Sequence, residues 1–310
     1  MKKYALSAIA LFLFIIMSVL SASVWYFSGK IVEFKTLSLS VIKEKYNPPN
    51  PEDYGLPKNP ENIMIPSGDL YLSGWFFRNR IKAKKCGAVI AHGHTVNRYA
   101  SLKYAPLFWK RHCHILLFDH RHHGDSAGNF GTYGFYEKDD MISSAEYLKL
   151  LTGLPDNKIA LFGESYGGAA SLLAVSDSDK YAFVGADSPY MDLDSIIRER
   201  AEKDYGKILL PLVPITMWTA GLRAGFNPEA VNIKKAAKKI RIPVFISHSR
   251  QDDFTPPNHS EQIFENVETE KKVLHITDWG ASHTRSINEK PEEYEKQMDD
   301  FIERYVPSFL

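Results

Sequence analysis

The chain has 310 residues, and its 38 lysines and arginines nearly balance its 37 acidic residues, for a formal net charge of +1. A charge so close to zero predicts no nucleic-acid or polyanion partner. Hydrophobic residues make up 44% of the chain, enough for a sizeable core, and the length favours one large α/β domain with an appendage over two independent domains.

The N-terminus predicts a membrane-spanning helix. Residues 5–27 are apolar, and no charge follows Lys3 until Lys30. As a helix this stretch would reach about 34 Å, enough to cross the hydrocarbon core of a bilayer. The aromatic residues 25–27 resemble an interfacial belt, and the lysines before the stretch favour a cytoplasmic N-terminus. We therefore expect an uncleaved signal-anchor over 1–30, in a single-pass protein of the cell membrane.

A cleaved signal peptide is the alternative interpretation of this segment. The small residues 21–23 could form the cleavage site. Cleavable apolar cores are usually shorter than this one, which continues past that site. Both interpretations place the rest of the chain outside the cytoplasm, and cleavage would make the protein secreted.

A connecting segment is expected next. Residues 31–42 alternate loosely between apolar and polar, as in a stalk or a first strand, and residues 47–60 are rich in proline. We assign 31–60 to a stalk or linker and 61–310 to the folded domain.

The folded domain begins with a predicted β-hairpin, because residues 61–66 and 70–77 flank a turn that contains Gly68. Later apolar runs lack polar alternation, as expected for strands that helices cover on both faces. These runs are 88–91, 115–118, 159–162, 182–186, 244–246 and 273–276. Helical patterns separate them, and a last helix is expected over 291–306. The sequence thus predicts an α/β fold with a mostly parallel, doubly covered sheet and an antiparallel hairpin at its N-terminal edge.

The two cysteines, Cys86 and Cys113, lie six residues before His92 and Asp119, where two of these strands end. If the strands are parallel neighbours, the thiols lie at the same height and could form a disulfide in an oxidising compartment. Two buried free thiols are the alternative.

A tight turn between strand and helix predicts a nucleophile. Residues 163–167 read Gly-Glu-Ser-Tyr-Gly, after the apolar run 159–162 and before the small-residue stretch 168–175. A G-x-S-x-G in this context is a nucleophile elbow, which holds the serine hydroxyl above the sheet on strained backbone. Ser165 is therefore the candidate nucleophile.

An insertion interrupts the alternation of strands and helices over residues 190–227. It combines an amphipathic stretch, 191–205, with an apolar stretch punctuated by proline, 208–218. An insertion here would lie above the carboxyl ends of the strands, where open α/β sheets hold their binding sites. We expect a helical lid.

A serine nucleophile needs a base within hydrogen-bond reach and an acid that orients the base. The order that follows an elbow is acid and then base, each in a loop after a strand. Asp252 follows the strand 244–246, and His283 follows the strand that begins at Val273. They are the candidate acid and base. Asp253 is the second choice of acid.

Three further histidines lie near these loops. His275 falls within a strand and is expected in the core or at an edge. His248 and His259 are expected to orient the acid loop or to face solvent.

The tetrahedral intermediate of acyl transfer needs two N–H donors for its oxyanion, each worth about 3 kcal/mol of barrier. The backbone N–H of Tyr166, directly after the nucleophile, is the first candidate. The second is the backbone N–H of His94, in the loop after the strand 88–91, where Gly93 allows a tight bend.

Four motifs in this order resemble those of the α/β-hydrolases, from about Glu61 to the C-terminus. Residues 92–98 resemble the H-G-x-x-x-N-R loop of a membrane-anchored bacterial branch related to cephalosporin-C deacetylase-like and prolyl-oligopeptidase-like hydrolases. Residues 119–126 resemble D-x-R-G-H-G-x-S, with His122 where glycine is usual. Residues 248–256 resemble H-G-x-x-D-x-x-x-P, which places the aspartate at Asp252. The resemblance implies a serine hydrolase, commonly an esterase, thioesterase or amidase.

A run of histidines near the second motif could suggest a metal site. The residues are His112, His114, His120, His122 and His123. They lie on both sides of a strand, and no cysteine or carboxylate is spaced with them as a ligand set would be. We expect no metal and no cofactor.

We expect Ser165 to attack an ester or thioester and to form an acyl-enzyme that water releases. The substrate would be a small-molecule acyl ester or a lipid-like molecule, since the expected lid is apolar and adjoins a membrane. The alternative is that the apolar residues only pack the lid onto the body. A serine peptidase or amidase is one alternative, although nothing resembles the large N-terminal propeller of many prolyl-oligopeptidase relatives. The other is a catalytically silent, membrane-tethered binding protein.

Overall fold

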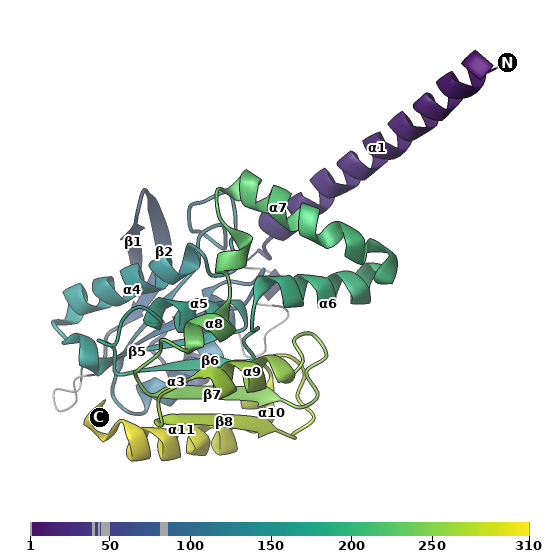
Figure 1. Ribbon diagram of the computed structural model, residues 1–310. Coiled ribbons are helices and arrows are strands. Elements are labelled where there is room, and N and C mark those ends of the chain that lie inside the picture. The colour runs from purple at the N-terminus through teal and green to yellow at the C-terminus, as the bar shows by residue number, and fades with distance from the viewer. Residues whose placement is uncertain (1, 39–40, 43, 45–49, 81–85, 310) are drawn as a thin grey trace.

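Eight strands form one sheet at the centre of the protein, whose computed structural model describes residues 2–38, 41–42, 44, 50–80 and 86–309 (Figure 1). The strands are β1 (Glu61–Ser67), β2 (Leu70–Phe77), β3 (Gly87–Ala91), β4 (His114–Phe118), β5 (Ile159–Glu164), β6 (Phe183–Asp187), β7 (Val244–Ser249) and β8 (Lys272–Thr277). Their order is β1-β2-β4-β3-β5-β6-β7-β8. β1 and β2 form an antiparallel hairpin, β2 is antiparallel to β4, and the other pairs are parallel. The predicted α/β sheet with its N-terminal hairpin is confirmed.

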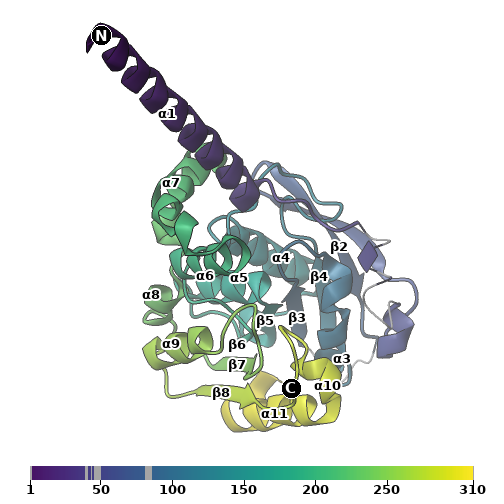
Figure 2. The same ribbon diagram turned by 90° about the vertical axis from the view of Figure 1, so that its right-hand side faces the viewer.

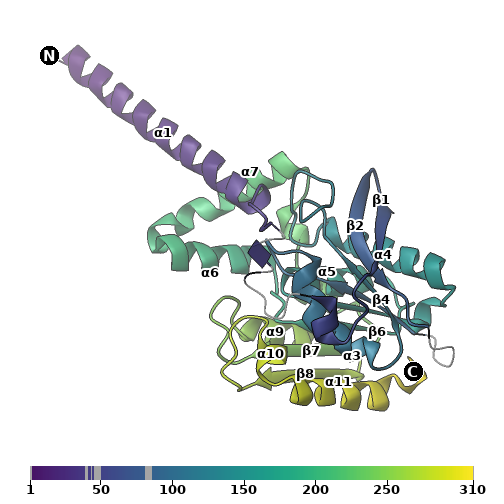
Figure 3. The ribbon, with the colours of Figure 1, turned by 180° about the vertical axis from the view of Figure 1, so that it is seen from behind.

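Helices cover both faces of this sheet. They are α3 (Ala105–Trp109), α4 (Glu137–Thr152), α5 (Tyr166–Val175), α8 (Ile233–Ala237), α9 (Asn258–Asn266), α10 (Ser286–Glu289) and α11 (Pro291–Tyr305). α4, α5 and α8 lie on one face in Figure 1, and α3 and α11 lie on the other in Figure 3. Successive strand residues supply the two cores, for example Val89 on the α5 side and Ile90 on the α11 side. Both faces of the sheet are therefore buried, which explains why the apolar runs of its strands are uninterrupted.

The predicted helical insertion follows β6. It consists of α6 (Leu193–Tyr205), the 3-10 turn η4 (Lys207–Leu212) and α7 (Val213–Ala224). Asp192 caps α6 by accepting a hydrogen bond from Ser195 N (2.7 Å), and Gly225, with φ of 69°, ends α7. Figures 1 and 2 show α6 and α7 projecting from the body beside the N-terminal helix.

The N-terminal helix α1 (Lys2–Val32) is long and apolar enough over Leu6–Val32 to cross a membrane. It is a candidate membrane anchor or signal sequence.

The last two residues of α1 and Phe34 after it correct the expectation of a stalk from residue 31 onward. Ile31, Val32 and Phe34 are buried in the same core as α5. Val32 O accepts a hydrogen bond from Gly131 N (2.9 Å), so the chain is bound to the body here. The reason is that these apolar side chains gain more from burial than from a solvated stalk. Of the remaining linker, residues 39–40, 43 and 45–49 lie outside the described residues.

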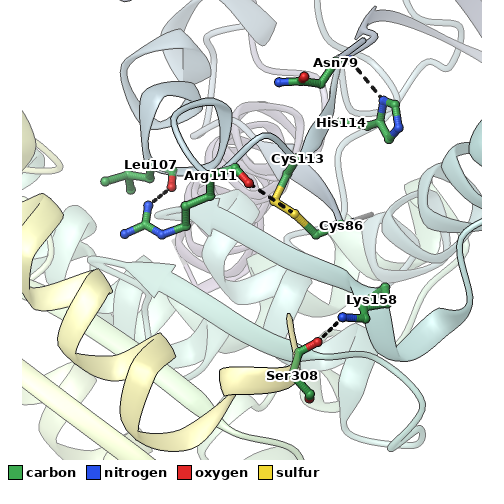
Figure 4. Close-up of a disulfide and its surroundings, with 8 residues drawn as sticks. All are labelled: Asn79, Cys86, Leu107, Arg111, Cys113, His114, Lys158 and Ser308. Carbon is green, nitrogen blue, oxygen red and sulfur yellow. Dashed lines mark hydrogen bonds between the residues drawn. A yellow bond between two sulfur atoms is a disulfide. The ribbon is translucent and has the colours of Figure 1, made fainter. Parts of the chain in front are cut away.

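Cys86 and Cys113 form a disulfide (Figure 4). Each cysteine directly precedes a strand, and the parallel register of β3 and β4 pairs Gly87 with His114. The two Cα atoms are consequently 4.6 Å apart. The disulfide, which sequence analysis left open against two free thiols, joins the starts of two central strands.

Candidate active site

Ser165 lies in the turn between β5 and α5. Its backbone has φ of 50° and ψ of −113°, in the positive-φ region that side chains rarely adopt. The turn is tight enough to exclude side chains beside it: a Cβ on Gly163 would lie 2.3 Å from Gly167 C, and one on Gly167 would lie 2.6 Å from Ala91 O. The glycines of the motif therefore permit the close approach of α5 to β3 and β5.

Asp252 and His283 meet in the loops after β7 and β8. His283 Nδ1 donates a hydrogen bond of 2.6 Å to Asp252 Oδ2. The other carboxylate oxygen of Asp252 accepts hydrogen bonds from the backbone N–H groups of Phe254 (3.0 Å) and Thr255 (2.9 Å). The loop thus fixes the carboxylate, and the carboxylate fixes the orientation of the imidazole.

His248 is a second imidazole beside this carboxylate. It is fully buried, with Nε2 3.2 Å from Asp252 Oδ2 and 2.7 Å from Thr255 O. Burial of Asp252 opposes its ionisation, but the hydrogen bonds from His248 and His283 outweigh it and hold the pKa of Asp252 well below its usual value. Asp252 is therefore ionised at neutral pH.

Three other residues considered near these loops, Asp253, His259 and His275, make contacts outside the pair of Asp252 and His283. Asp253 is on the surface, with 78% of its side chain exposed, and pairs with Lys203 Nζ of α6 at 2.7 Å. His259 Nε2 is 2.8 Å from Glu199 Oε2, and its Nδ1 accepts from Met191 N (3.0 Å), so it ties α9 to the start of the insertion. His275 lies in β8 as expected, with its ring 5.6 Å from that of Phe245.

Phe254 lies between the surroundings of Ser165 and those of His283. The His283 ring lies 5.0 Å from the ring of Phe254, which lines the same cavity as Ser165. No hydrogen bond joins the Ser165 hydroxyl to His283 among the described residues. Catalytic hydrogen bonds are often long in the absence of substrate and tighten in the substrate complex.

The two candidate oxyanion donors also border this cavity. Tyr166 is the first residue of α5, where backbone N–H groups have no partner within the helix. His94 follows β3, and its side chain lines the cavity with Ser165 and Tyr166. Within the part of the chain that the structure describes, neither backbone N–H donates a hydrogen bond, so both are available to a ligand oxygen.

Asp119 fixes the loop that carries His94. Its carboxylate accepts hydrogen bonds from the backbone N–H of Arg98 (2.8 Å) and of Asp125 (2.9 Å), and it also pairs with the Arg98 guanidinium. The H-G-x-x-x-N-R loop and the D-x-R loop are therefore held as one unit.

The cavity above Ser165 has a volume of about 320 Å³ and mostly apolar walls. Ser165, Tyr166 and His94 line it. Its other walls include Phe27, Ile31, Ile196, Ile197, Tyr205, Leu212 and Val213. Helices α1, α6 and α7 thus enclose the space in front of the serine.

Comparison with known proteins identifies the family of this chain. The model of the prolyl oligopeptidase family (Peptidase_S9) matches residues 127–308. The chain belongs to the prolyl oligopeptidase family. The Bacillus subtilis (strain 168) protein YqkD is 34% identical over 217 residues, which cover 69% of this chain and 70% of YqkD.

Solved structures agree with this assignment. The Pyrococcus furiosus esterase Pf2001 is 25% identical with a TM-score of 0.67, and the match covers 84% of this chain and 99% of that one. The Pyrococcus horikoshii acylaminoacyl peptidase has the same fold at 19% identity, with a TM-score of 0.60 over 80% of this chain and 42% of the peptidase. The protein is thus a serine hydrolase with the α/β-hydrolase fold.

His122 departs from the usual glycine of its motif, and the structure shows why glycine is usual there. The backbone of His122 has φ of 64°, a left-handed conformation that favours glycine. Its Nε2 lies 3.0 Å from Phe34 O, so its side chain contacts the segment after α1.

The histidine run lies on both sides of β4. His120 and His123 pack around His92, with ring centroids 4.8 and 4.9 Å from the His92 ring, whereas His114 begins β4 at the far end of the strand. Among the described residues, no group of three or more histidine, cysteine or acidic side chains is placed to hold a metal ion.

Lys103 connects the loops of the candidate nucleophile and base, although no motif in the sequence points to it. Its Nζ is 2.6 Å from Glu164 Oε2 and donates to Thr284 O at 2.8 Å, and both side chains of the ion pair are buried. Glu164 precedes Ser165, and Thr284 follows His283. A charged Glu164 at the end of a buried strand was the available signal, since a buried charge requires a partner.

The buried histidines predict that stability falls in acid. Burial lowers the pKa of His92 from 6.5 to about 3, and burial also places the pKa values of His120 and His123 well below 6.5. Below about pH 6.5 the unfolded chain therefore binds protons that the folded protein does not. The free energy of unfolding should fall by about 1.4 kcal/mol per pH unit for each such histidine between about pH 6 and pH 4.

Urea denaturation of the full chain in detergent at several pH values measures this dependence. His120→Leu removes one of the titrations without breaking a side-chain hydrogen bond, because both ring nitrogens of His120 lack a partner. The free energy of unfolding of this variant should change with pH less steeply than that of wild type, by about 1.4 kcal/mol per pH unit. Equal slopes in the two proteins would contradict the prediction.

Proposed function

We propose that the protein is an esterase that cleaves carboxylic esters or thioesters through Ser165, His283 and Asp252. The observation that carries this proposal is the hydrogen bond between His283 and the ionised Asp252, whose loop supplies Phe254 and Thr255 to the walls of the cavity of Ser165. Acid and base follow the elbow in the chain order that this mechanism uses.

In the proposed reaction, Ser165 Oγ attacks the carbonyl carbon while His283 Nε2 takes the hydroxyl proton. Asp252 holds the imidazole through Nδ1 and stabilises its positive charge. The backbone N–H groups of Tyr166 and His94 bind the oxyanion. His283 then gives its proton to the departing alkoxide or thiolate, which leaves an acyl-enzyme. Water, deprotonated by His283, attacks this ester and releases the acid and free Ser165.

An acyl ester is favoured over a peptide for two reasons. The walls of the cavity are mostly apolar, which suits an acyl chain better than a peptide backbone that needs hydrogen-bond partners. The esterase Pf2001 matches over nearly its whole length, whereas this chain spans 42% of the acylaminoacyl peptidase. A peptidase or amidase remains the second candidate, supported by the family to which the chain belongs.

We further propose that α1 is a retained anchor and that the catalytic domain lies outside the cytoplasm. The disulfide between Cys86 and Cys113 supports this location, because such bonds persist in oxidising compartments. The crevice that Met17 and Leu20 of α1 share with Leu212 and Ile215 supports retention, since Met17 and Leu20 precede the possible cleavage site at 21–23.

The test compares esters and anilides that carry the same acyl group, over a series of chain lengths, together with labelling by a fluorophosphonate. We expect labelling and faster turnover of the ester at every length. Faster turnover of the anilides would favour the peptidase or amidase. Absence of both labelling and turnover would favour a silent binding protein.

A further inference from the structure

Helix α7 exposes an apolar stripe. Ile215, Trp218 and Leu222 lie three and four residues apart, on one side of the helix, and are 46%, 59% and 63% exposed. The neighbouring helix α6 instead exposes charged pairs such as Arg198 with Asp194. An exposed stripe of large apolar residues indicates contact with a partner or a membrane.

Helix α7 packs along the C-terminal part of α1 (Figures 1 and 2). At one end, the Arg223 guanidinium lies 4.1 Å from the Trp25 ring, donates to Trp25 O at 2.8 Å and pairs with Glu33 at 2.6 Å. At the other end, Leu212, Ile215 and Thr219 border a crevice with α1. The residues of α1 in that crevice are Met17, Leu20, Ser21, Val24 and Trp25.

These contacts fix the depth of α7 relative to a bilayer that α1 would span. Met17 lies eight residues before Trp25, which corresponds to about 12 Å along the helix axis. With Trp25 and Tyr26 in the interface, Met17 lies among the acyl chains. Ile215 and Leu212 lie beside this part of α1, so the first turns of α7 reach the boundary between headgroups and acyl chains.

The cavity of Ser165 is enclosed by the same helices. Phe27 and Ile31 of α1, Tyr205 of α6 and Val213 of α7 are among its walls. The Phe27 and Tyr205 rings meet edge to face at 5.1 Å. The cavity is thus bordered by the two helices that adjoin the bilayer.

We propose that α7 lies in the non-cytoplasmic leaflet beside α1, and that a long-chain acyl ester dissolved in the bilayer enters the cavity between these helices. The apolar stripe contacts lipid in this proposal because the stripe continues the surface of α1. That surface is itself exposed from Leu6 to Ala22. It rests on the esterase function proposed above. It adds that α1 forms part of the binding site as well as the anchor.

Tryptophan fluorescence tests the position of α7 without reference to catalysis. The full chain is reconstituted in phosphatidylcholine vesicles whose acyl chains carry bromine, which quenches nearby indoles. Trp218→Phe should remove the part of the quenchable emission that does not come from Trp25. Trp279→Phe, in the loop after β8, should leave the quenchable emission unchanged. Equal quenching in wild type and Trp218→Phe would overturn the proposal.

Activity on two methylumbelliferyl esters tests the route of the substrate. Ile215→Asp places a charge in the first turn of α7, on the part of the stripe that shares a crevice with Met17, and Ile215 does not line the cavity. Leu150→Asp is a matched control on α4, where Leu150 is 77% exposed. We expect Ile215→Asp to lower hydrolysis of the palmitate in phosphatidylcholine vesicles about tenfold, a loss equivalent to about 1.4 kcal/mol. Hydrolysis of the acetate in water should be unchanged, and Leu150→Asp should change neither.

The outcomes separate this inference from the proposed function. Wild type that fails to hydrolyse the acetate would refute the esterase. Normal acetate hydrolysis with equal palmitate hydrolysis in Ile215→Asp and wild type would refute only the membrane route. A wild-type dimer that Ile215→Asp dissociates, with Trp218 unquenched, would assign the stripe to a second copy and also overturn the inference.

Discussion

Ser165→Ala should lower kcat for methylumbelliferyl acetate by about 10⁵-fold and abolish labelling by a fluorophosphonate. Alanine keeps the fold of the turn but removes the only atom that can form the acyl-enzyme. Steady-state kinetics and gel fluorescence of the labelled protein measure both effects. Residual hydrolysis would then reflect only binding and the N–H groups of Tyr166 and His94.

Ser171→Ala is the matched control for this variant. Ser171 lies on α5, the helix that follows Ser165, and is buried, but its hydroxyl donates to Gly167 O at 2.7 Å and does not line the cavity. This variant should retain both labelling and turnover. Turnover by Ser165→Ala at the rate of wild type, or labelling that survives in it, would show that another residue is the nucleophile.

The sheet was predictable because its signals are local. The hairpin rests on a short turn between two alternating runs, and the buried strands rest on continuous apolar runs such as 159–162. The elbow of Ser165 needs only five residues and their two neighbouring elements. Each of these features is decided within about ten residues of the chain.

Contacts between distant segments were not predictable. Phe34 packs against the rings of His94 and His122, at 4.0 and 5.1 Å, across a sequence distance that no periodicity records. The residues after α1 therefore looked like a stalk. Lys103 and Glu164 meet in the same way, because the partner of a buried charge is chosen by the tertiary fold.

The conformation of the loop after β7 decides which of two adjacent carboxylates contacts His283, and the sequence alone does not give that conformation. Neighbouring residues in an irregular turn point in different directions. The positions of Asp252 and Asp253 in the sequence therefore do not decide which of them is the catalytic acid. In the structure, the backbone N–H groups of Phe254 and Thr255 hold the Asp252 carboxylate toward His283. Asp253 instead reaches Lys203 on α6.

Asp252→Asn should therefore lower kcat about 10⁴-fold, whereas Asp253→Asn should leave it within about twofold of wild type. An amide at residue 252 can donate to His283 Nδ1 and thereby stabilise the tautomer that carries its proton on Nε2, which cannot accept the proton of Ser165. It also removes the negative charge that stabilises the imidazolium. The two substitutions are chemically identical and adjacent in the chain, so their difference reports the contacts that only Asp252 makes, with His283, His248 and the backbone of its own loop.

Methylumbelliferyl acetate hydrolysis by both variants, with urea denaturation to show that each is folded, measures this difference. The pH profile separates a catalytic from a merely structural effect. Asn at 252 cannot ionise, so the rate lost at neutral pH should return in part at alkaline pH, where hydroxide replaces the base-activated water. If Asp253→Asn is the impaired variant and Asp252→Asn retains full activity, the acid is assigned to the wrong residue. The hydrogen bond between Asp252 and His283 would then serve stability rather than catalysis.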